Sequence, residues 1–311
     1  MKVIIVGSNG YLGQVLNKKL KSKKYDVTNL DLGIFGKKYA IPGYIKCDAY
    51  TYDVSELFSN TDAIVHLAGV SNDPASELNP ELTLTMNLNL TKKLIDYAKF
   101  FNVNKFIFAS SASIYGFNND FVDERSMPNP QSLYASTKLQ SEQYINMVFP
   151  NATILRFGTL FGPSEKMRFD IAINLMIKTG LINKKVVVYG GNQFRPFLFV
   201  SDAALAIKYA LDNDAFGTFN IYSENMDICE LGEKISSKLK CDLEIAPATD
   251  PRNYKMSTLG LYGYKPRTSL DIGIDQTIKY VKHMIDEEVY VEGDEFYTLR
   301  MWKRYINDTL F

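Results

Sequence analysis

Three side chains in one stretch of the chain are of the types that proton transfer to and from an alcohol requires. Tyr134 and Lys138 are four residues apart, so on a helix they project from the same face. A free phenol has a pKa of about 10, and a nearby ammonium favours the phenolate and lowers that pKa. The hydroxyl of Ser111 can bind the same substrate oxygen and stabilise its changing charge. The three side chains predict a site that takes a proton from an alcohol or returns one to a ketone.

The surrounding sequence predicts the elements that position these groups. The apolar run 106–109 ends in Ser110 and Ser111, which is typical of a strand buried on both faces. A loop with two prolines follows, and the pattern then predicts a helix over residues 133–148, stopped by Pro150. A Tyr-x-x-x-Lys pair also occurs on ordinary amphipathic helices. In this chain, however, Tyr134 is the only tyrosine with a lysine four places on.

The start of the chain predicts a dinucleotide site. Residues 2–7 read as a buried strand, and Gly7, Gly10 and Gly13 lead from it into a helix. Glycine lets the backbone approach a pyrophosphate, which then sits on the helix N-terminus. A second strand, 25–30, ends in Asp31, close to the offset of about 20 residues expected for a ribose-binding acid. Because Asp31 would repel a 2′-phosphate, we expect NAD rather than NADP.

The Gly-x-x-Gly-x-x-Gly spacing, with Ser111, Tyr134 and Lys138, resembles the extended short-chain dehydrogenase/reductase family. Within it, residues 2–273 resemble the branch of nucleotide-sugar epimerases and dehydratases, to which the UDP-glucose 4-epimerases belong. The resemblance implies an α/β fold, a Rossmann-type doubly wound parallel sheet with a smaller α/β substrate-binding domain. We expect the NAD-binding domain over residues 1–160 with a return at about 185–222. The nucleotide-sugar substrate domain is expected over 161–184 and 223–311.

The resemblance also implies cofactor contacts beyond the glycine turn. Asp48, at the end of a predicted strand over 44–48, is expected at the adenine amino group, although it could equally be a loop carboxylate. The run 66–69 resembles a His-Leu-Ala-Gly motif whose small residues let the backbone pass the cofactor. Asn87 matches an asparagine that anchors the cofactor region. The whole expected cofactor set is Gly7, Asn9, Gly10, Tyr11, Leu12, Gly13, Asp31, Asp48, Leu67, Ala68, Gly69, Asn87, Ser110, Tyr134 and Lys138.

Substrate contacts are expected from a loop and from later motifs. Ser71 and Asn72 follow the fourth predicted strand at its carboxyl end, where ligands bind in open α/β sheets. By resemblance, Asn174 matches an asparagine that usually meets the sugar diphosphate. Arg195 and Arg252 match two arginines on the phosphate side, where the guanidinium fork suits two oxygens at once. For Arg195 the alternative is a surface ion pair.

The reaction implied by the resemblance begins with oxidation of the sugar C4 hydroxyl. If the ketone turns in the site and takes hydride back on its other face, the enzyme is a 4-epimerase, which we favour. If the ketone leaves, the enzyme is a C4 dehydrogenase or, in reverse, a 4-ketoreductase. Dehydration is disfavoured because the family's 4,6-dehydratases carry Asp-Glu where this chain has Ala112 and Ser113. A non-catalytic NAD-binding regulatory protein is a further alternative, but such relatives usually lack the Tyr or the Lys.

Composition narrows the class of partner. The chain has 311 residues, and its 35 Lys and Arg balance 35 Asp and Glu, so no preference for nucleic acid or membrane is expected. Three cysteines and two histidines show no metal-ligand spacing. We find no signal peptide and no apolar run long enough to span a membrane, so a cytoplasmic enzyme is expected. The resemblance implies a homodimer through helices 83–101 and 133–148, and a setting in polysaccharide biosynthesis.

Overall fold

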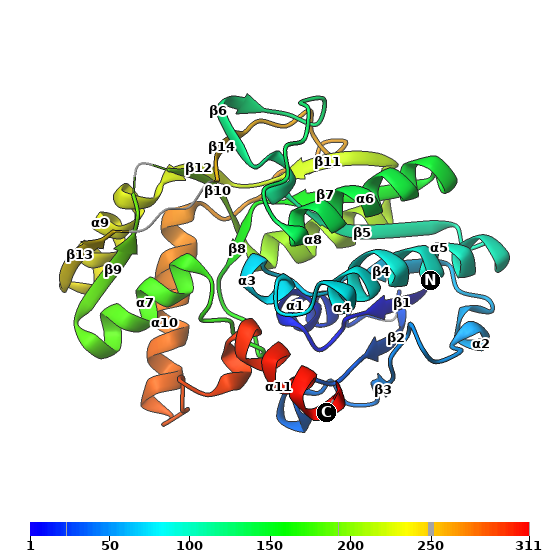
Figure 1. Ribbon diagram of the computed structural model, residues 1–311, viewed down its shortest axis with the longest axis horizontal. Helices are drawn as coiled ribbons and strands as arrows, with labels where there is room; N and C mark the ends of the chain where they lie inside the picture. The colour runs from blue at the N-terminus through cyan, green and yellow to red at the C-terminus, as the bar shows by residue number, and fades with distance from the viewer. Residues whose placement is uncertain (23, 192, 248–251, 311) are drawn as a thin grey trace.

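A parallel sheet of seven strands forms the centre of the molecule (Figure 1). The computed structural model describes residues 1–22, 24–191, 193–247 and 252–310. In spatial order the strands are β11, β7, β5, β4, β1, β2 and β3, and every neighbouring pair is parallel. Their bounds are β1 Lys2–Val6, β2 Asp26–Asp31, β3 Ile45–Lys46, β4 Ala63–His66, β5 Lys105–Ser111, β7 Ala152–Phe157 and β11 Gly217–Ile221. This is the doubly wound order that the sequence predicts.

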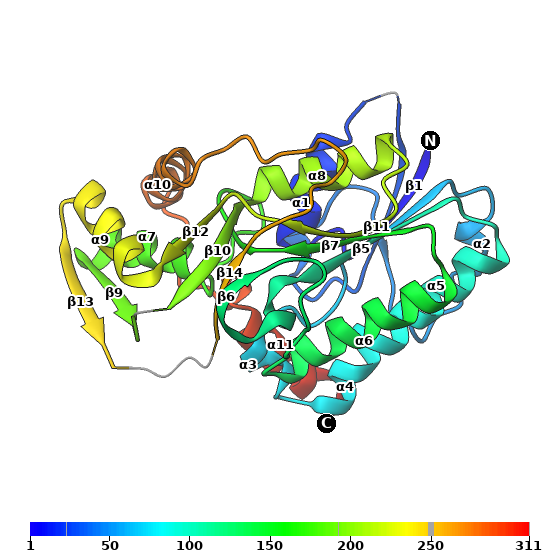
Figure 2. The same ribbon diagram turned by 90° about the horizontal axis from the view of Figure 1, so that it is seen from above.

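Helices cover both faces of this sheet (Figure 2). On one face lie α1, Tyr11–Lys19, and α8, Val200–Asp212. On the other lie α5, Leu90–Phe100, and α6, Leu133–Val148. The observed bounds of α6 are those predicted, because Ser132 caps it by accepting from the Ala135 amide at 3.1 Å and Pro150 follows its end.

The predicted helix over 83–101 is built from three segments in succession. These are α4, Pro80–Leu84, a π-helical turn η2, Thr85–Asn89, and α5. The shorter helical pieces of the chain are η1 Lys37–Tyr39, α2 Ser55–Phe58, α3 Asp73–Ser76, η3 Ala112–Tyr115 and η4 Asp294–Phe296.

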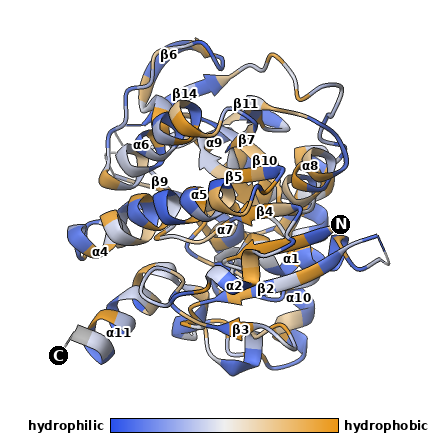
Figure 3. Cartoon of the chain, turned by 90° about the vertical axis from the view of Figure 1, so that its right-hand side faces the viewer, coloured by the Kyte–Doolittle hydropathy of each residue, from blue (hydrophilic) through white to orange (hydrophobic). Residues whose placement is uncertain are grey.

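The interior strands are apolar because both of their faces are covered. Along β1, Val3 and Ile5 pack into the cluster that contains α1 and α8. Ile4 and Val6 point to the opposite face and join the cluster beneath α5. Figure 3 shows these central strands largely in orange, beneath helices that carry blue segments on their outer faces.

The smaller lobe consists of three short sheets and three helices. Its sheets pair β8 Thr159–Phe161 with β10 Phe194–Phe199 and β12 Glu224–Asp227, then β9 Lys185–Tyr189 with β13 Asp242–Ala246, then β6 Phe117–Val122 with β14 Asn253–Met256. Its helices are α7 Ala172–Asn183, α9 Ile228–Leu239 and α10 Leu270–Asp286. The predicted return to the large sheet at about residue 185 is therefore wrong, since β9 and β10 belong to the smaller lobe. The return begins with α8, after residue 199, and ends with β11.

The last helix, α11, Thr298–Leu310, lies against the large sheet's side of the molecule and not within the smaller lobe (Figure 1). Trp302 is buried there in a cluster with Val70, Ala75 and Met86. The sequence places this helix in the substrate domain, and its amphipathic pattern alone does not reveal which lobe it packs on.

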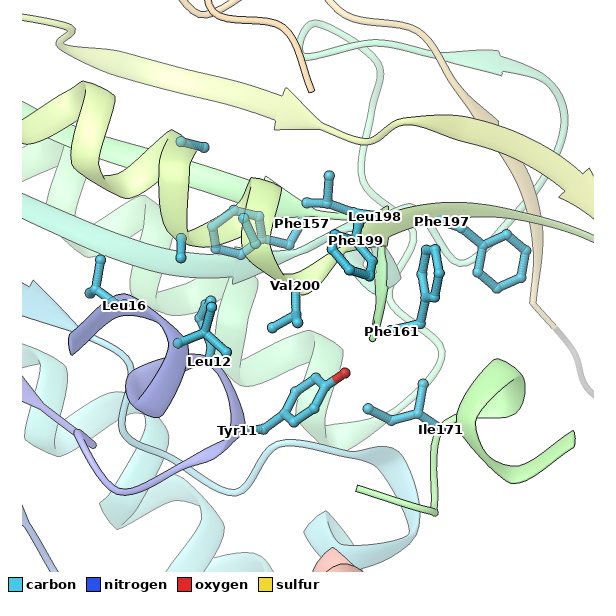
Figure 4. Close-up of a cluster of buried hydrophobic side chains, with 14 of the residues drawn as sticks. Tyr11, Leu12, Leu16, Phe157, Phe161, Ile171, Phe197, Leu198, Phe199 and Val200 are labelled. Carbon is cyan, nitrogen blue, oxygen red and sulfur yellow. The ribbon is translucent and has the colours of Figure 1, made fainter. Parts of the chain in front are cut away.

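Apolar side chains join the two lobes (Figure 4). Tyr11 and Leu12, from the start of α1, share one core cluster with Phe161, Ile171 and Phe197 of the smaller lobe. The Tyr11 hydroxyl also donates to the Gly162 carbonyl at 2.6 Å. The glycine turn is thus held directly against the segment that follows β8.

Candidate active site

Tyr134, Lys138 and Ser111 lie together at the carboxyl end of the sheet. Ser111 is the last residue of β5, and the other two lie on the first turns of α6. The Lys138 ammonium is 6.0 Å from the centroid of the Tyr134 ring and donates to the Ala109 carbonyl at 2.8 Å. The Ser111 hydroxyl accepts from the Ser113 hydroxyl at 2.9 Å. The predicted triad is therefore assembled in one place.

The pKa of Tyr134 differs from the prediction. It is raised to about 12, first by burial and also by the carboxylate of Asp73. A hydrogen bond with Ser111 and the charge of Arg168 lower it, but by less. The Lys138 ammonium is turned to the Ala109 carbonyl in this structure. Without a bound cofactor, the phenol is thus held in its protonated form.

Lys138 and Ser110 are tied to a buried ion pair. Burial lowers the pKa of Lys138 to about 8, partly offset by the carboxylate of Glu142. That carboxylate forms a forked ion pair with Arg156, at 2.7 Å for the closest atoms, and accepts from the Ser110 hydroxyl. Ser110 therefore holds the end of β5 against α6. Arg156, although charged and close to the site, is likewise used inside the protein, as the partner of Glu142.

The glycine turn has the geometry that only glycine allows. Gly7 has φ of 89°, and a Cβ there would lie 2.6 Å from the Ala68 amide nitrogen. At Gly13 a Cβ would lie 2.4 Å from the Ser8 carbonyl oxygen. The first residues of α1 line a cavity, so the helix N-terminus is placed where an anion could bind its backbone N–H groups.

The carboxylate of Asp31 is oriented by the turn itself. It accepts from the Asn9 amide at 2.9 Å and from the Gly33 amide at 2.7 Å. These two bonds lower its pKa, but burial outweighs them and raises it overall. Asn9, which the sequence predicts to be a cofactor residue, does not line the cavity described below. Its side chain accepts from the Ile41 amide instead, so it fixes the turn that presents Asp31.

A single cavity of about 720 Å³ joins these parts. It is lined by the predicted triad and by every predicted cofactor residue except Asn9 and Asn87. Asn87 is buried behind the wall, where its amide binds the Val70 backbone at 2.7 and 3.2 Å and the Thr137 hydroxyl at 3.0 Å. It thus connects the loop after β4 with α6, which agrees with an anchoring role but not with a direct contact.

Of the five predicted substrate residues, four line the cavity and Asn174 does not. Asn174 has no exposed surface. Its amide is bound to the Gly162 nitrogen, the Tyr11 hydroxyl and the Arg168 carbonyl. In this structure both ends of this side chain are used to join α7 to neighbouring segments, and the contact with a diphosphate stays a prediction.

The two predicted arginines lie on the smaller lobe's side of the cavity. The Arg195 guanidinium is buried, donates to Gln193 and to the Arg252 carbonyl, and lies 5.6 Å from the centroid of the Tyr254 ring. Arg252 forms an ion pair with Asp73 at 2.5 Å. Asp250 and Pro251, which directly precede Arg252 in the sequence, lie outside the described residues.

Sequence reasoning missed a second ion pair in the wall. Arg168 binds Asp170 through two nitrogens, at 2.9 and 3.2 Å, and donates weakly to the Ser71 hydroxyl at 3.4 Å. Asp170 also accepts from the Asn72 side chain at 2.9 Å and the Thr298 amide at 3.0 Å. One carboxylate thus joins the loop after β4, the segment after β8 and the start of α11. No local motif marks this arrangement, since the partners other than Arg168 are 98 and 128 residues away from Asp170.

A family model allows this cavity to be assigned. The model of the NAD dependent epimerase/dehydratase family matches residues 3–222, more than half of the chain. The chain belongs to this family. As a member, the protein is an NAD-dependent enzyme, as the sequence predicts.

Relatives along nearly the whole chain agree with this family. The Bacillus subtilis protein named uncharacterized UDP-glucose epimerase YtcB is 28% identical over 321 residues, covering 93% of this chain and 100% of its own. The UDP-glucuronate 4-epimerase of Thermodesulfobacterium geofontis is 26% identical over 291 residues, covering 87% of this chain and 84% of its own.

Solved structures of this family share the fold. MoeE5 in complex with UDP-glucose and NAD superposes with a TM-score of 0.82 at 23% identity, over 92% of this chain and 100% of its own. The Thermus thermophilus UDP-glucose 4-epimerase complex with NAD gives 0.79 at 22%, over 91% of this chain and 99% of its own.

The described residues fit NAD on their own geometry. The turn at Gly7 and Gly13 leaves the N-terminus of α1 open to a pyrophosphate, and Asp31 stands one strand away with an oriented carboxylate for a ribose. Two further findings concern metal ions and membranes. No cluster of His, Cys, Asp and Glu in the described ranges has the arrangement of a metal site. No helix in the part of the chain that the structure describes is long and apolar enough to cross a membrane.

Proposed function

We propose that this protein is an NAD-dependent nucleotide-sugar 4-epimerase in which Tyr134, Lys138 and Ser111 carry out proton transfer at the sugar C4 oxygen. The observation that supports it best is the convergence of the triad and the glycine turn on one cavity. Both relatives described above are named as epimerases of UDP-sugars, which supports UDP as the nucleotide.

Each residue has a defined part in the proposed reaction. NAD, held by the glycine turn and Asp31, would supply a hydride acceptor and donor for the sugar C4 carbon. Tyr134, as the phenolate, takes the proton of the C4 hydroxyl and gives it back after the ketone has turned. Ser111 donates a hydrogen bond to the same oxygen throughout. Since the pKa of Tyr134 is about 12 here, the phenolate must be favoured by the positive charge of the oxidised nicotinamide ring, together with Lys138.

The nucleotide end is assigned to the arginine side of the cavity. Arg195 and Arg252 present guanidinium groups from the smaller lobe, which suits the diphosphate of a nucleotide sugar. Ser71 and Asn72 line the cavity from the carboxyl end of β4 and are proposed to contact the sugar. The pair Arg168–Asp170, which binds both of them, is proposed to hold this wall in place.

The residues after Ser111 argue against dehydration. Ala112 is buried, and the Ser113 hydroxyl is bound to Ser111. Neither supplies the acid and base that removal of water requires. Epimerisation and release of the ketone differ only in whether the ketone stays, so the test must measure both the sugar and the redox state of the cofactor.

The experiment compares Tyr134→Phe with Tyr144→Phe. Tyr144 lies on the same helix but binds Asp96 outside the cavity, so it controls for loss of a hydroxyl from α6. With UDP-glucose or UDP-glucuronic acid, we expect Tyr134→Phe to lower turnover by about 10²- to 10⁴-fold while NAD content is unchanged. Isomerised sugar without net NADH identifies the epimerase. Accumulation of NADH with a ketosugar would identify the dehydrogenase, and full activity of Tyr134→Phe would overturn the assignment.

We further infer a homodimer formed through α5 and α6. Its support is the family resemblance together with two exposed apolar side chains, Phe100 at 78% and Met147 at 74%, at the ends of these helices. Light scattering after gel filtration should give twice the chain mass of 35.3 kDa. A mass equal to one chain at all concentrations would contradict it.

A further inference from the structure

Lys166 is a buried cation that the proposed chemistry does not use. It lies between β8 and α7, is 1% exposed, and lines the cavity. Its one hydrogen bond is to the carbonyl of its neighbour Met167, at 3.3 Å. Its ammonium lies 4.3 Å from the centroid of the Phe35 ring. Burying an ammonium with so little compensation is costly, so its position needs a further explanation.

Two arginines of the cavity wall are paired with acids. Arg168 binds Asp170, and Arg252 binds Asp73. Lys166 makes no ion pair within the described ranges of the chain. The carboxylates of Asp170 and Glu295 act on it only at longer range, and the like charge of Arg168 has a larger effect than either. The site around Lys166 is therefore short of negative charge.

The surroundings of Lys166 identify the anion that would supply this charge. Two residues before it, the Ser164 hydroxyl donates to the Tyr11 carbonyl at 2.8 Å, at the start of α1. Phe35, beneath the ammonium, follows the strand that ends in Asp31. Lys166 thus faces the cofactor half of the cavity, between the glycine turn and the ribose-binding acid. The first turn of α1 carries no charged side chain of its own.

We propose that Lys166 binds the pyrophosphate of the dinucleotide, from the side opposite the N-terminus of α1. The helix end offers N–H groups and a partial positive charge, and Lys166 adds a full charge from the smaller lobe. A 2′-phosphate is the less suitable anion, because the carboxylate of Asp31 faces the ribose and would repel it. The cofactor is thereby held by both lobes.

The test uses the full chain freed of nucleotide, with ADP and adenosine as probes. ADP carries the diphosphate but no nicotinamide, so it does not reach Lys138, and adenosine carries no phosphate at all. Calorimetry would compare the wild type with Lys166→Met, which keeps the length and apolar stem of the side chain. We expect ADP to bind the variant roughly 10- to 100-fold more weakly, since one charge-assisted hydrogen bond is lost. Adenosine should bind both proteins equally.

Two further measurements separate charge from packing. Lys166→Arg keeps the cation and should recover part of the ADP affinity. The wild type should not bind NADP more tightly than NAD when the two affinities are measured side by side. Equal binding of ADP to the wild type and Lys166→Met would overturn the proposal, as would an equal loss of adenosine, which would indicate a packing defect. Because no sugar is present, these outcomes are independent of whether the enzyme is a 4-epimerase.

Discussion

Replacing Lys166 by Met should stabilise the protein freed of nucleotide, and the gain should depend on pH. Burial lowers the pKa of Lys166 from 10.5 to about 7, with a smaller contribution from Arg168. The unfolded chain therefore binds more protons than the folded chain between about pH 7 and 10.5. The free energy of unfolding of the wild type rises with pH across this window, and Lys166→Met removes that dependence.

The size of the effect follows from the two pKa values. Proton linkage gives a penalty in the wild type of about 4 kcal/mol at pH 7, about 2 kcal/mol at pH 9 and under about 1 kcal/mol at pH 10. The variant loses the contact with Phe35, worth about 1 kcal/mol. The net gain is then about 3 kcal/mol at pH 7 and under about 1 kcal/mol at pH 10, where the folded-state amine is neutral and has no cation–π contact to lose. For a chain of this length the gain raises Tm by roughly 6 °C at pH 7.

Thermal unfolding in phosphate-free buffer at several pH values measures this gain. Lys166→Arg provides the comparison, because a guanidinium stays charged and should unfold at a lower temperature than the wild type at every pH. Saturating ADP should reverse the order of wild type and Lys166→Met at pH 7, since only the wild type pairs its ammonium with the diphosphate. A Tm for Lys166→Met at or below the wild type at pH 7, or a gain that persists undiminished at pH 10, would refute the reasoning.

Three further substitutions test the cofactor site. Asp31→Ala should weaken the binding of NAD by roughly 10- to 100-fold in calorimetry and reduce the protein's preference for NAD over NADP. An unchanged preference would contradict the role given to Asp31. Gly7→Ala should lower the free energy of unfolding by about 1–3 kcal/mol more than Gly36→Ala, which shares a positive φ but meets no atom within 4 Å. Equal losses in denaturant titrations would show that the contact with the Ala68 backbone is unimportant. Trp302→Ala should speed release of NAD during gel filtration while Trp302→Phe retains it, because α11 lines the cavity. Equal retention would rule out a covering role.

The sequence predicts elements best where local signals define both ends. Helix α6 has the predicted bounds because Ser132 caps it and Pro150 follows it. The strand predicted over 44–48 is less accurate, since β3 pairs only at Ile45–Lys46 on the sheet edge. Asp48 nevertheless lines the cavity from the turn that follows. Edge pairing depends on the neighbouring strand, which local propensity does not describe.

The residues of the site were also predicted best where a local pattern marks them. The glycine turn, Asp31 and the triad are short-range patterns whose chemistry requires particular spacing, and the structure brings them into one cavity. Asn174 shows the opposite case. Its amide is consumed by backbone and side-chain groups from three segments, and that burial cannot be read from the motif around it.

Asp170 shows why the remaining wall could not be predicted. Burial raises its pKa, but Arg168 and the hydrogen bonds of Thr298 lower it by more, so the group is ionised. An ionised carboxylate in this position must have all its acceptor sites filled, and it obtains the donors from Asn72 and Thr298, 98 and 128 residues away. Neither donor carries a charge that would identify it in the sequence as a partner of Asp170. The bond to Thr298 ties the start of α11 to the cavity wall, in addition to the apolar packing of Trp302, and neither contact can be read from the sequence around Asp170.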